Sequence, residues 1–208
     1  MFKGIFAVLS RLCILPVFVV GTFLAGCAGN TTYPEVSQAP DYEYIVGAGD
    51  SVEIFVWGNP ELSTTVVVRP DGKITTRLVE DIPASGRSST QLAREIETAY
   101  SRYVKSPVVS VIVNRFVGVP TQQVRVVGEA LQPLSVPYNK HMSLLDLMIA
   151  VGGLSEFAAG NKSVLVRNFN GQQEMYTLRL DDLLKDGDIS VNTPMMPGDI
   201  VIIPEAWF

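Results

Sequence analysis

Histidine and cysteine are scarce in this chain. Its 208 residues include one histidine, His141, and two cysteines, Cys13 and Cys27. Zinc sites in proteins use three or four ligands, most often cysteine and histidine, so this supply predicts no metal site. Cys13 falls in an N-terminal segment that we expect to be removed. The mature chain then keeps one cysteine and cannot form an internal disulfide.

Basic residues are also few. The first 26 residues hold Lys3 and Arg11 and no acidic residue, and without them the chain has 14 basic and 21 acidic residues, a formal charge of −7. Proteins that bind nucleic acid neutralise its phosphates with Lys and Arg. The sequence has no basic stripe that would serve this purpose, and we exclude nucleic acid as a partner.

Sequence motifs for catalysis and nucleotide binding are missing. The stretches GAGD and VGGL lack the Lys-Ser/Thr of a phosphate-binding loop, and no G-x-S-x-G motif surrounds Ser143. Glycoside hydrolysis needs two carboxylates that face each other across a bond, but the members of the pair Glu80 and Asp81 are adjacent in the chain. Asp181 and Asp182 are adjacent too, and acids at the start of a short helix complement its dipole. We therefore predict no catalytic residue, no cofactor and no enzymatic activity.

Long apolar runs are limited to the N-terminal end. The run Leu12–Leu24 is shorter than the roughly 20 residues that a helix needs to span a bilayer. Basic residues precede it and small residues follow it, which is the pattern of a secretory signal peptide over residues 1–26.

The end of this leader carries a lipidation signal. The sequence Leu24-Ala25-Gly26-Cys27 resembles the bacterial lipobox, in which the cysteine becomes the acylated first residue of a lipoprotein. The alternative is a plain signal peptide with a chance cysteine. Ala28, in place of aspartate, resembles lipoproteins sent to the outer membrane. Acyl chains contribute about 0.8 kcal/mol per buried methylene, and the polar residues 27–41 predict a tether.

Residues 42–115 predict a first small module. Val52, Ile54 and Val56 alternate with polar and aromatic residues, which indicates a half-buried strand. Two further strands, over residues 62–69 and 73–78, are predicted to form a hairpin around a turn.

The same module should contain one helix. Ser88 and Gln91 form a capping box that begins it, and a strand over residues 108–113 follows it. The apolar side chains of the helix fall on one face at helical spacing: Leu92, Ile96, Ala99, Tyr100 and Tyr103.

Residues 123–204 predict a second module. A strand over 124–127 precedes a helix capped by Ser143 with Asp146. Asn170-Gly171 marks a hairpin, and the β-branched run in PGDIVIIPEAWF predicts a buried closing strand over 199–203. The fold class is therefore α+β, in two small modules.

Both modules resemble parts of one known family. The first, with YIVGAGDSVEIFVWGNPELSTTVVVRPDGKITTRL, is similar to the polysaccharide export domain of outer-membrane polysaccharide export proteins. The second, with VRVVGEALQPLSVPYNKHMSLLDLMIAVGGL, is similar to their SLBB domain, a soluble-ligand-binding β-grasp module. The ending PGDIVIIPEAWF resembles members found in exosortase-linked exopolysaccharide systems.

The resemblance implies a lipoprotein on the periplasmic face of the outer membrane. It implies a homo-oligomeric ring that passes an exopolysaccharide or capsule chain from an inner-membrane copolymerase towards the cell surface. The best-known capsule exporters continue into a membrane-crossing C-terminal helix, whereas this sequence stops at Phe208. We therefore expect a separate outer-membrane β-barrel to complete the conduit. An alternative function is a glycan-binding lipoprotein that anchors surface polysaccharide without transporting it.

Few individual residues stand out for a role in such a conduit. Arg69-Pro70-Asp71-Gly72 is the hallmark turn of the export domain, and turn chemistry explains it well. Trp57 and Tyr138 have rings that can stack on sugars, although core or interface packing is favoured. Trp207 and Phe208 have little chain to cover them and predict an interface.

Overall fold

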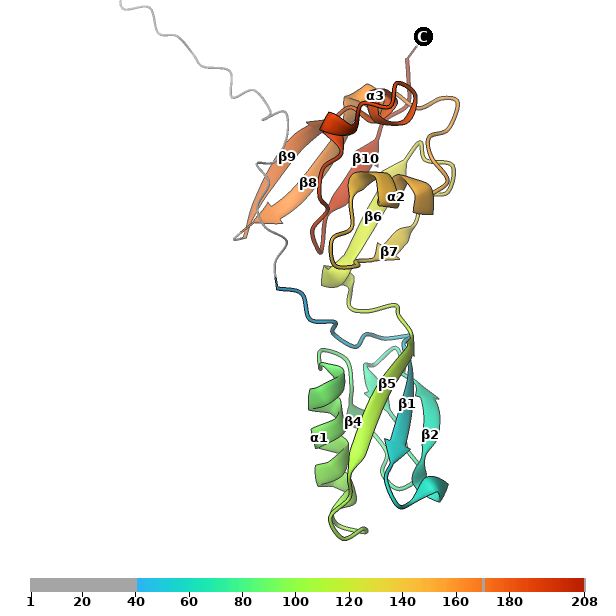
Figure 1. The fold of residues 1–208 in the computed structure, drawn as a ribbon, viewed down its shortest axis with the longest axis vertical. Helices are drawn as coiled ribbons and strands as arrows, with labels where there is room; N and C mark the ends of the chain where they lie inside the picture. The colour runs from blue at the N-terminus through green and yellow to red at the C-terminus, as the bar shows by residue number, and fades with distance from the viewer. Residues whose placement is uncertain (1–40, 170, 208) are drawn as a thin grey trace, which may run out of the picture.

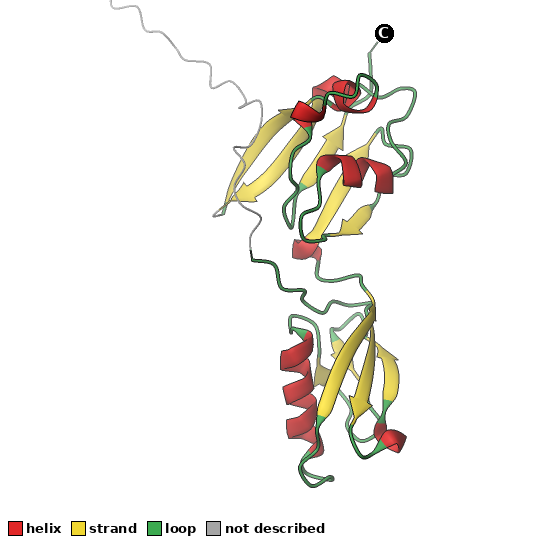
Figure 2. Cartoon of the chain, in the orientation of Figure 1, coloured by secondary structure: helices red, strands yellow, loops and turns green. Residues whose placement is uncertain are grey.

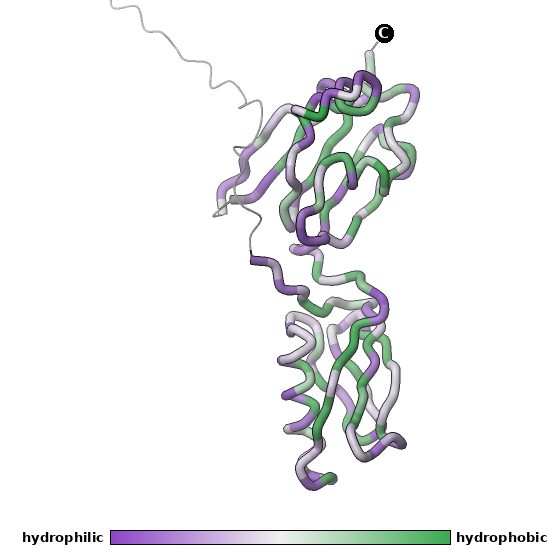
Figure 3. The backbone as a smooth tube through the Cα atoms, in the orientation of Figure 1, coloured by the Kyte–Doolittle hydropathy of each residue, from purple (hydrophilic) through white to green (hydrophobic). Residues whose placement is uncertain are grey.

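The computed structural model describes residues 41–169 and 171–207. They form two modules, each with its own sheet and its own hydrophobic core, which lie end to end in Figure 1. The fold is α+β, as the sequence predicted. Hydrophobic residues lie along many of the strands in both modules (Figure 3).

The first module is a three-stranded antiparallel sheet covered on one face by a helix. The sheet order is β2-β1-β5, and the elements are β1 (Ser51–Val56), β2 (Thr64–Val67), β5 (Val109–Arg115) and α1 (Ser89–Tyr100). The alternation in β1 is confirmed, because Val52, Ile54 and Val56 are buried while Phe55 is exposed. These side chains pack with Leu92 of α1 in one core cluster.

Helix α1 begins where the sequence predicted and ends earlier. The Ser88 hydroxyl accepts from the Gln91 N–H, and the Gln91 side chain accepts from the Ser88 N–H, which confirms the capping box. After Tyr100 the chain turns back, because the Tyr100 carbonyl accepts from the N–H groups of Tyr103 and Val104. Tyr103 therefore lies beyond the helix and is 65% exposed, so its prediction as part of the buried face is wrong.

The predicted hairpin in this module is wrong in its pairing. The strand expected over 73–78 is only β3 (Lys73–Ile74), which pairs with β4 (Ile82–Pro83) in a separate two-stranded sheet. The strand stops because Thr76 closes a tight turn with Val79: the Thr76 N–H and hydroxyl both donate to the Val79 carbonyl. No local sequence pattern predicted β4.

The second module is a five-stranded mixed sheet of order β7-β6-β10-β8-β9. Its elements are β6 (Gln123–Gly128), β7 (Ser135–Pro137), β8 (Ser163–Phe169), β9 (Gln172–Leu178), β10 (Ile200–Ile203), α2 (Leu144–Ala150) and α3 (Leu180–Leu184). Both helices contribute side chains to one core cluster, and α2 lies over one face of the sheet in Figure 2. Short 3₁₀ turns lie at Pro60–Leu62, Pro120–Gln122, Gly160–Lys162 and Ile189–Val191.

The last strand lies in the middle of this sheet. Strand β10 runs parallel to β6 and antiparallel to β8, and its Val201 and Ile203 are buried. The buried closing strand that the sequence predicted is confirmed. The capping box of Ser143 with Asp146 is confirmed too, and so is the hairpin between β8 and β9, in which Phe169 pairs with Gln172.

A buried ion pair joins β8 to the start of β10. The Arg167 guanidinium donates to both carboxylate oxygens of Asp199, from Nε at 3.0 Å and from Nη2 at 2.7 Å. Both side chains are almost fully buried, at 5% and 1% exposure. The pair is also hydrogen-bonded to the backbone, because Arg167 donates to the Pro194 carbonyl and Asp199 accepts from the Met196 N–H. These contacts hold the loop that leads into β10 in place.

We expect Asp199→Ala to lower the free energy of unfolding by about 3–5 kcal/mol, because it leaves the Arg167 charge buried without its partner. Urea unfolding followed by circular dichroism measures this loss. Lys185→Ala is the matched control, since it breaks the more exposed Lys185–Asp181 pair and should cost less than about 1 kcal/mol. Similar losses in the two variants would contradict the assigned role of the buried pair.

Candidate functional site

The turn Arg69–Gly72 is held by its own charged side chains. The Arg69 guanidinium donates to the Asp71 carboxylate and, at 2.8 Å, to Oδ1 of Asp81. The Gly72 N–H donates to the Arg69 carbonyl at 2.8 Å and closes the turn. The hydrogen bond from Arg69 lowers the pKa of Asp71 below its ordinary value. Because Arg69 holds both carboxylates, the motif acts here as a clamp between the turn and the segment before β4.

Two features of the turn require glycine at position 72. Its φ is +79°, in the left-handed region that other residues rarely adopt. A Cβ atom at this position would also lie 2.9 Å from Cβ of Ser85. The Gly72 carbonyl accepts from the N–H groups of Ala84 and Ser85, so the turn packs closely on the chain that follows β4.

Gly72→Ala should therefore lower the free energy of unfolding by about 1–3 kcal/mol through backbone strain alone, with a further loss from the clash with Ser85. Gly58→Ala isolates the backbone part, because Gly58 has a φ of +75° and open space around it. Thermal unfolding of the two variants compares them. A smaller loss for Gly72→Ala than for Gly58→Ala would refute the close-packing explanation.

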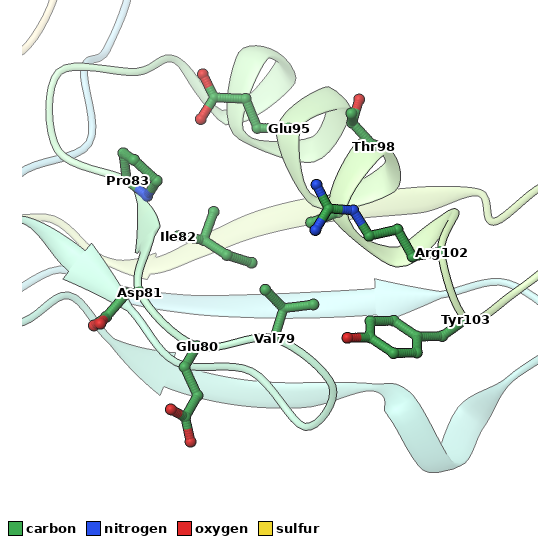
Figure 4. A pocket seen from close by; sticks show the side chains of 10 residues that line it. Val79, Glu80, Asp81, Ile82, Pro83, Glu95, Thr98, Arg102 and Tyr103 are labelled. Atoms are coloured by element: carbon green, nitrogen blue, oxygen red, sulfur yellow. The ribbon is translucent and has the colours of Figure 1, made fainter.

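A groove of about 330 Å³ lies between α1 and the segment that leads to β4. Its lining includes Glu80, Asp81, Glu95, Arg102 and Tyr103. Figure 4 shows the side chains of Glu80 and Asp81 pointing away from the helix that carries Glu95, and Asp81 is bound to Arg69. The two carboxylates do not face each other across the groove, as glycoside hydrolysis requires.

The second acidic pair also serves the fold. Asp181 and Asp182 lie in the first turn of α3, as predicted. The Asp181 carboxylate accepts from the Asn161 N–H, and Asp182 accepts from the Asn161 amide and from Arg179. These contacts tie α3 to the turn before β8. Within residues 41–169 and 171–207, no three His, Cys, Asp or Glu side chains are grouped as metal ligands.

The junction between the modules centres on Asp50, which the sequence did not mark. Asp50 is fully buried. Its Oδ1 accepts from the N–H groups of Val117 and Gly118, at 2.6 and 2.9 Å. Its Oδ2 accepts from the Gly47 N–H at 2.9 Å and from the Tyr44 hydroxyl at 2.6 Å. One carboxylate thus binds the segment that enters the first module to the segment that leaves it.

The side chain of Gln122 adds a second connection at this junction. Its amide oxygen accepts from the Ile45 N–H at 3.0 Å, and its amide nitrogen donates to the Glu43 carbonyl at 2.9 Å. The Gln123 amide donates to the Val117 carbonyl. Residues 41–47 therefore run beside the linker between the modules.

Aromatic rings gather at the same junction and line a pocket of about 220 Å³. Tyr42 packs edge to face on Tyr138, with ring centroids 4.9 Å apart, and Tyr44 packs edge to face on Phe116 at 5.2 Å. The sequence singled out only Tyr138 in this group. Its neighbours are far apart in the chain, and no local pattern predicts that they meet.

The other aromatic residues singled out from the sequence lie apart from this pocket. Trp57 is 70% exposed at the end of β1 and packs edge to face on Phe55. Trp207 is 93% exposed, just beyond Ala206, whose N–H donates to the Phe157 carbonyl. Phe208 lies outside the described residues, so the predicted interface of Trp207 with Phe208 stays a prediction.

The predicted lipidation signal lies outside the described residues as well. This applies to Leu24, Ala25, Gly26 and Cys27, and to residues 27–40 of the tether expected over residues 27–41. In the described part of the chain, no helix is both long and apolar enough to cross a membrane.

Comparison with known proteins identifies both modules. Residues 38–114 match the polysaccharide biosynthesis/export protein family, and residues 122–203 match the SLBB domain. The chain thus belongs to the family of outer-membrane polysaccharide export proteins, which is a family of exporters and not of enzymes.

Two curated relatives are similar over both modules. The EPS I polysaccharide export outer membrane protein EpsA of Ralstonia nicotianae is 25% identical over 196 residues, covering 83% of this chain and 49% of the relative. The protein of the same name from Ralstonia solanacearum is 26% identical over 182 residues, covering 76% and 47%. The chain spans about half the length of these relatives. The expected link to exosortase systems stays a prediction.

Proposed function

We propose that this protein is a lipid-anchored component of the apparatus that exports exopolysaccharide or capsule through the outer membrane. The tandem of an export domain and an SLBB domain carries the proposal, because it accounts for most of the chain. Two relatives with the same pair of regions are named as outer-membrane export proteins for a polysaccharide. The lipobox at Cys27 supports attachment to the periplasmic face of that membrane.

The protein acts in this proposal as one subunit of a ring. The sheet of the first module has α1 on one face, and large apolar side chains on its other face are exposed: Phe55, Trp57, Val67 and Ile112, at 40%, 70%, 61% and 49% exposure. Exposed apolar surface of this kind supports contact with another subunit. The expected inner-membrane copolymerase and the expected outer-membrane β-barrel would lie at the two ends of the conduit.

A glycan-binding anchor is the second candidate function. Both functions place the protein at the membrane and both need contact with polysaccharide. They differ in what happens to the polymer, because an exporter moves a chain that is still on its way out, whereas an anchor retains a finished chain.

Deletion of the gene separates the two functions. Loss of an exporter should leave polymer inside the cell envelope, and reintroducing the gene should restore polymer at the surface. Periplasmic and extracellular polymer are quantified after fractionation of the producing strain. Release of finished polymer into the medium, with none retained in the periplasm, would contradict export and support anchoring.

The lipid anchor is tested by Cys27→Ser, which removes the acylated sulfur. We expect the mature protein to move from the outer-membrane fraction to the soluble periplasmic fraction, because the buried methylene groups that hold it are lost. Immunoblots of the fractions measure the shift. Cys13→Ser is the matched control and should leave the protein in the membrane. A Cys27→Ser protein that stays in the outer-membrane fraction would disprove anchoring through this residue.

A further inference from the structure

We propose that the pocket at the junction of the modules binds single pyranose units of the exported polysaccharide. This inference rests on the proposed function for the identity of the polymer. The pocket is lined by Tyr42, Tyr44, Phe116, Pro137, Tyr138, Asn139 and Lys140. Four of the seven residues are aromatic, and the two polar ones, Asn139 and Lys140, are exposed.

The size of the pocket limits what it can hold. Its volume of about 220 Å³ is below the roughly 300–1,000 Å³ of pockets that enclose drug-sized ligands. One sugar ring suits a space of this size, whereas a nucleotide or a long apolar chain does not.

The walls supply the two kinds of contact that a pyranose offers. A sugar ring has a face of C–H groups, which packs on an aromatic ring, and a rim of hydroxyl groups, which donate and accept hydrogen bonds. The ring of Phe116 is 55% exposed, so it presents a surface for stacking. The amide of Asn139 and the ammonium group of Lys140 can bond the hydroxyl groups.

The fold leaves these polar groups largely unused. Lys140 is only loosely paired with Asp41 at 3.9 Å, and both side chains are exposed. The Asn139 amide has no hydrogen-bond partner among the described residues. A site whose polar atoms are not consumed by the fold has capacity for a ligand.

The aromatic walls come from both modules. Tyr44 packs against the core of the first module and contacts the ring of Phe116, and Tyr138 belongs to the core of the second module. Tyr42 packs on Tyr138, only two residues from Tyr44. A sugar in the pocket would therefore contact both modules at the point where Asp50 fixes the linker.

We expect the pocket to bind a sugar unit with low affinity, because a conduit must release the polymer that it transports. One aromatic stacking contact contributes about 0.5–1.5 kcal/mol beyond burial of its area. A polymer that is held through one sugar unit at a time by such weak contacts is released easily, so it can continue through the conduit.

The test uses the polymer secreted by the producing strain, broken into short oligosaccharides by mild acid. The intact protein, extracted in detergent, is titrated with these fragments by calorimetry. Hydrogen–deuterium exchange then locates the binding. We expect saturable binding and slower exchange in the segments 42–44, 116–118 and 137–140. Phe116→Ala should weaken binding about five- to tenfold, which corresponds to the loss of roughly 1 kcal/mol.

Two further variants guard against a structural explanation. Phe116→Tyr keeps the ring and should retain the affinity. Phe157→Ala removes a ring of the second module that is as exposed as Phe116 and does not line the pocket, and it should leave binding unchanged. Circular dichroism checks that each variant folds. Absence of saturable binding, an equal loss in Phe157→Ala, or protection of these segments by another export component and not by fragments would overturn the inference.

The failure of this inference differs from failure of the proposed function. If a strain without the gene still exports polymer, the proposed function is wrong. If export requires the gene but the fragments do not bind at the junction, only the sugar site is wrong.

Discussion

The buried carboxylate of Asp50 is the constraint on which the arrangement of the two modules depends. A linker between two domains is mobile unless a specific contact holds it. Here the N–H groups of Val117 and Gly118 both donate to Asp50, which also accepts from Gly47 and Tyr44. Hydrogen bonds to a charged group contribute about 1.5–3 kcal/mol, so the two from Val117 and Gly118 hold the linker against the first module.

The position of the aromatic pocket follows from this constraint. Tyr44 is tied to Asp50 through its hydroxyl and to Phe116 through its ring. Phe116 directly precedes Val117 and Gly118, whose N–H groups donate hydrogen bonds to Asp50. The same contacts bring Tyr42 against Tyr138 of the second module. The structure thus links the geometry between the modules to a pocket that is lined mainly by aromatic rings. A ligand in this pocket would contact both modules.

Local patterns in the sequence predicted the elements that depend on neighbouring residues. The capping boxes at Ser88 and Ser143, the alternation in β1 and the apolar run of β10 all follow from short-range chemistry. Strand pairing and long-range polar contacts could not be predicted from such local patterns. The strand at Lys73 pairs with β4 because a turn at Thr76 competes with its extension. Asp50 and its partners Val117 and Gly118 are more than sixty residues apart in the chain, and a single sequence carries no signal for such a contact.

The rate of amide hydrogen exchange at Val117 and Gly118 tests the central claim most directly. If Asp50 holds the linker, both amides exchange only when the first module opens, and their protection equals that of the core amides of β5. Exchange as fast as that of an exposed loop, in a protein whose β5 amides remain protected, would show that the linker is free and that the two modules are not fixed by this carboxylate.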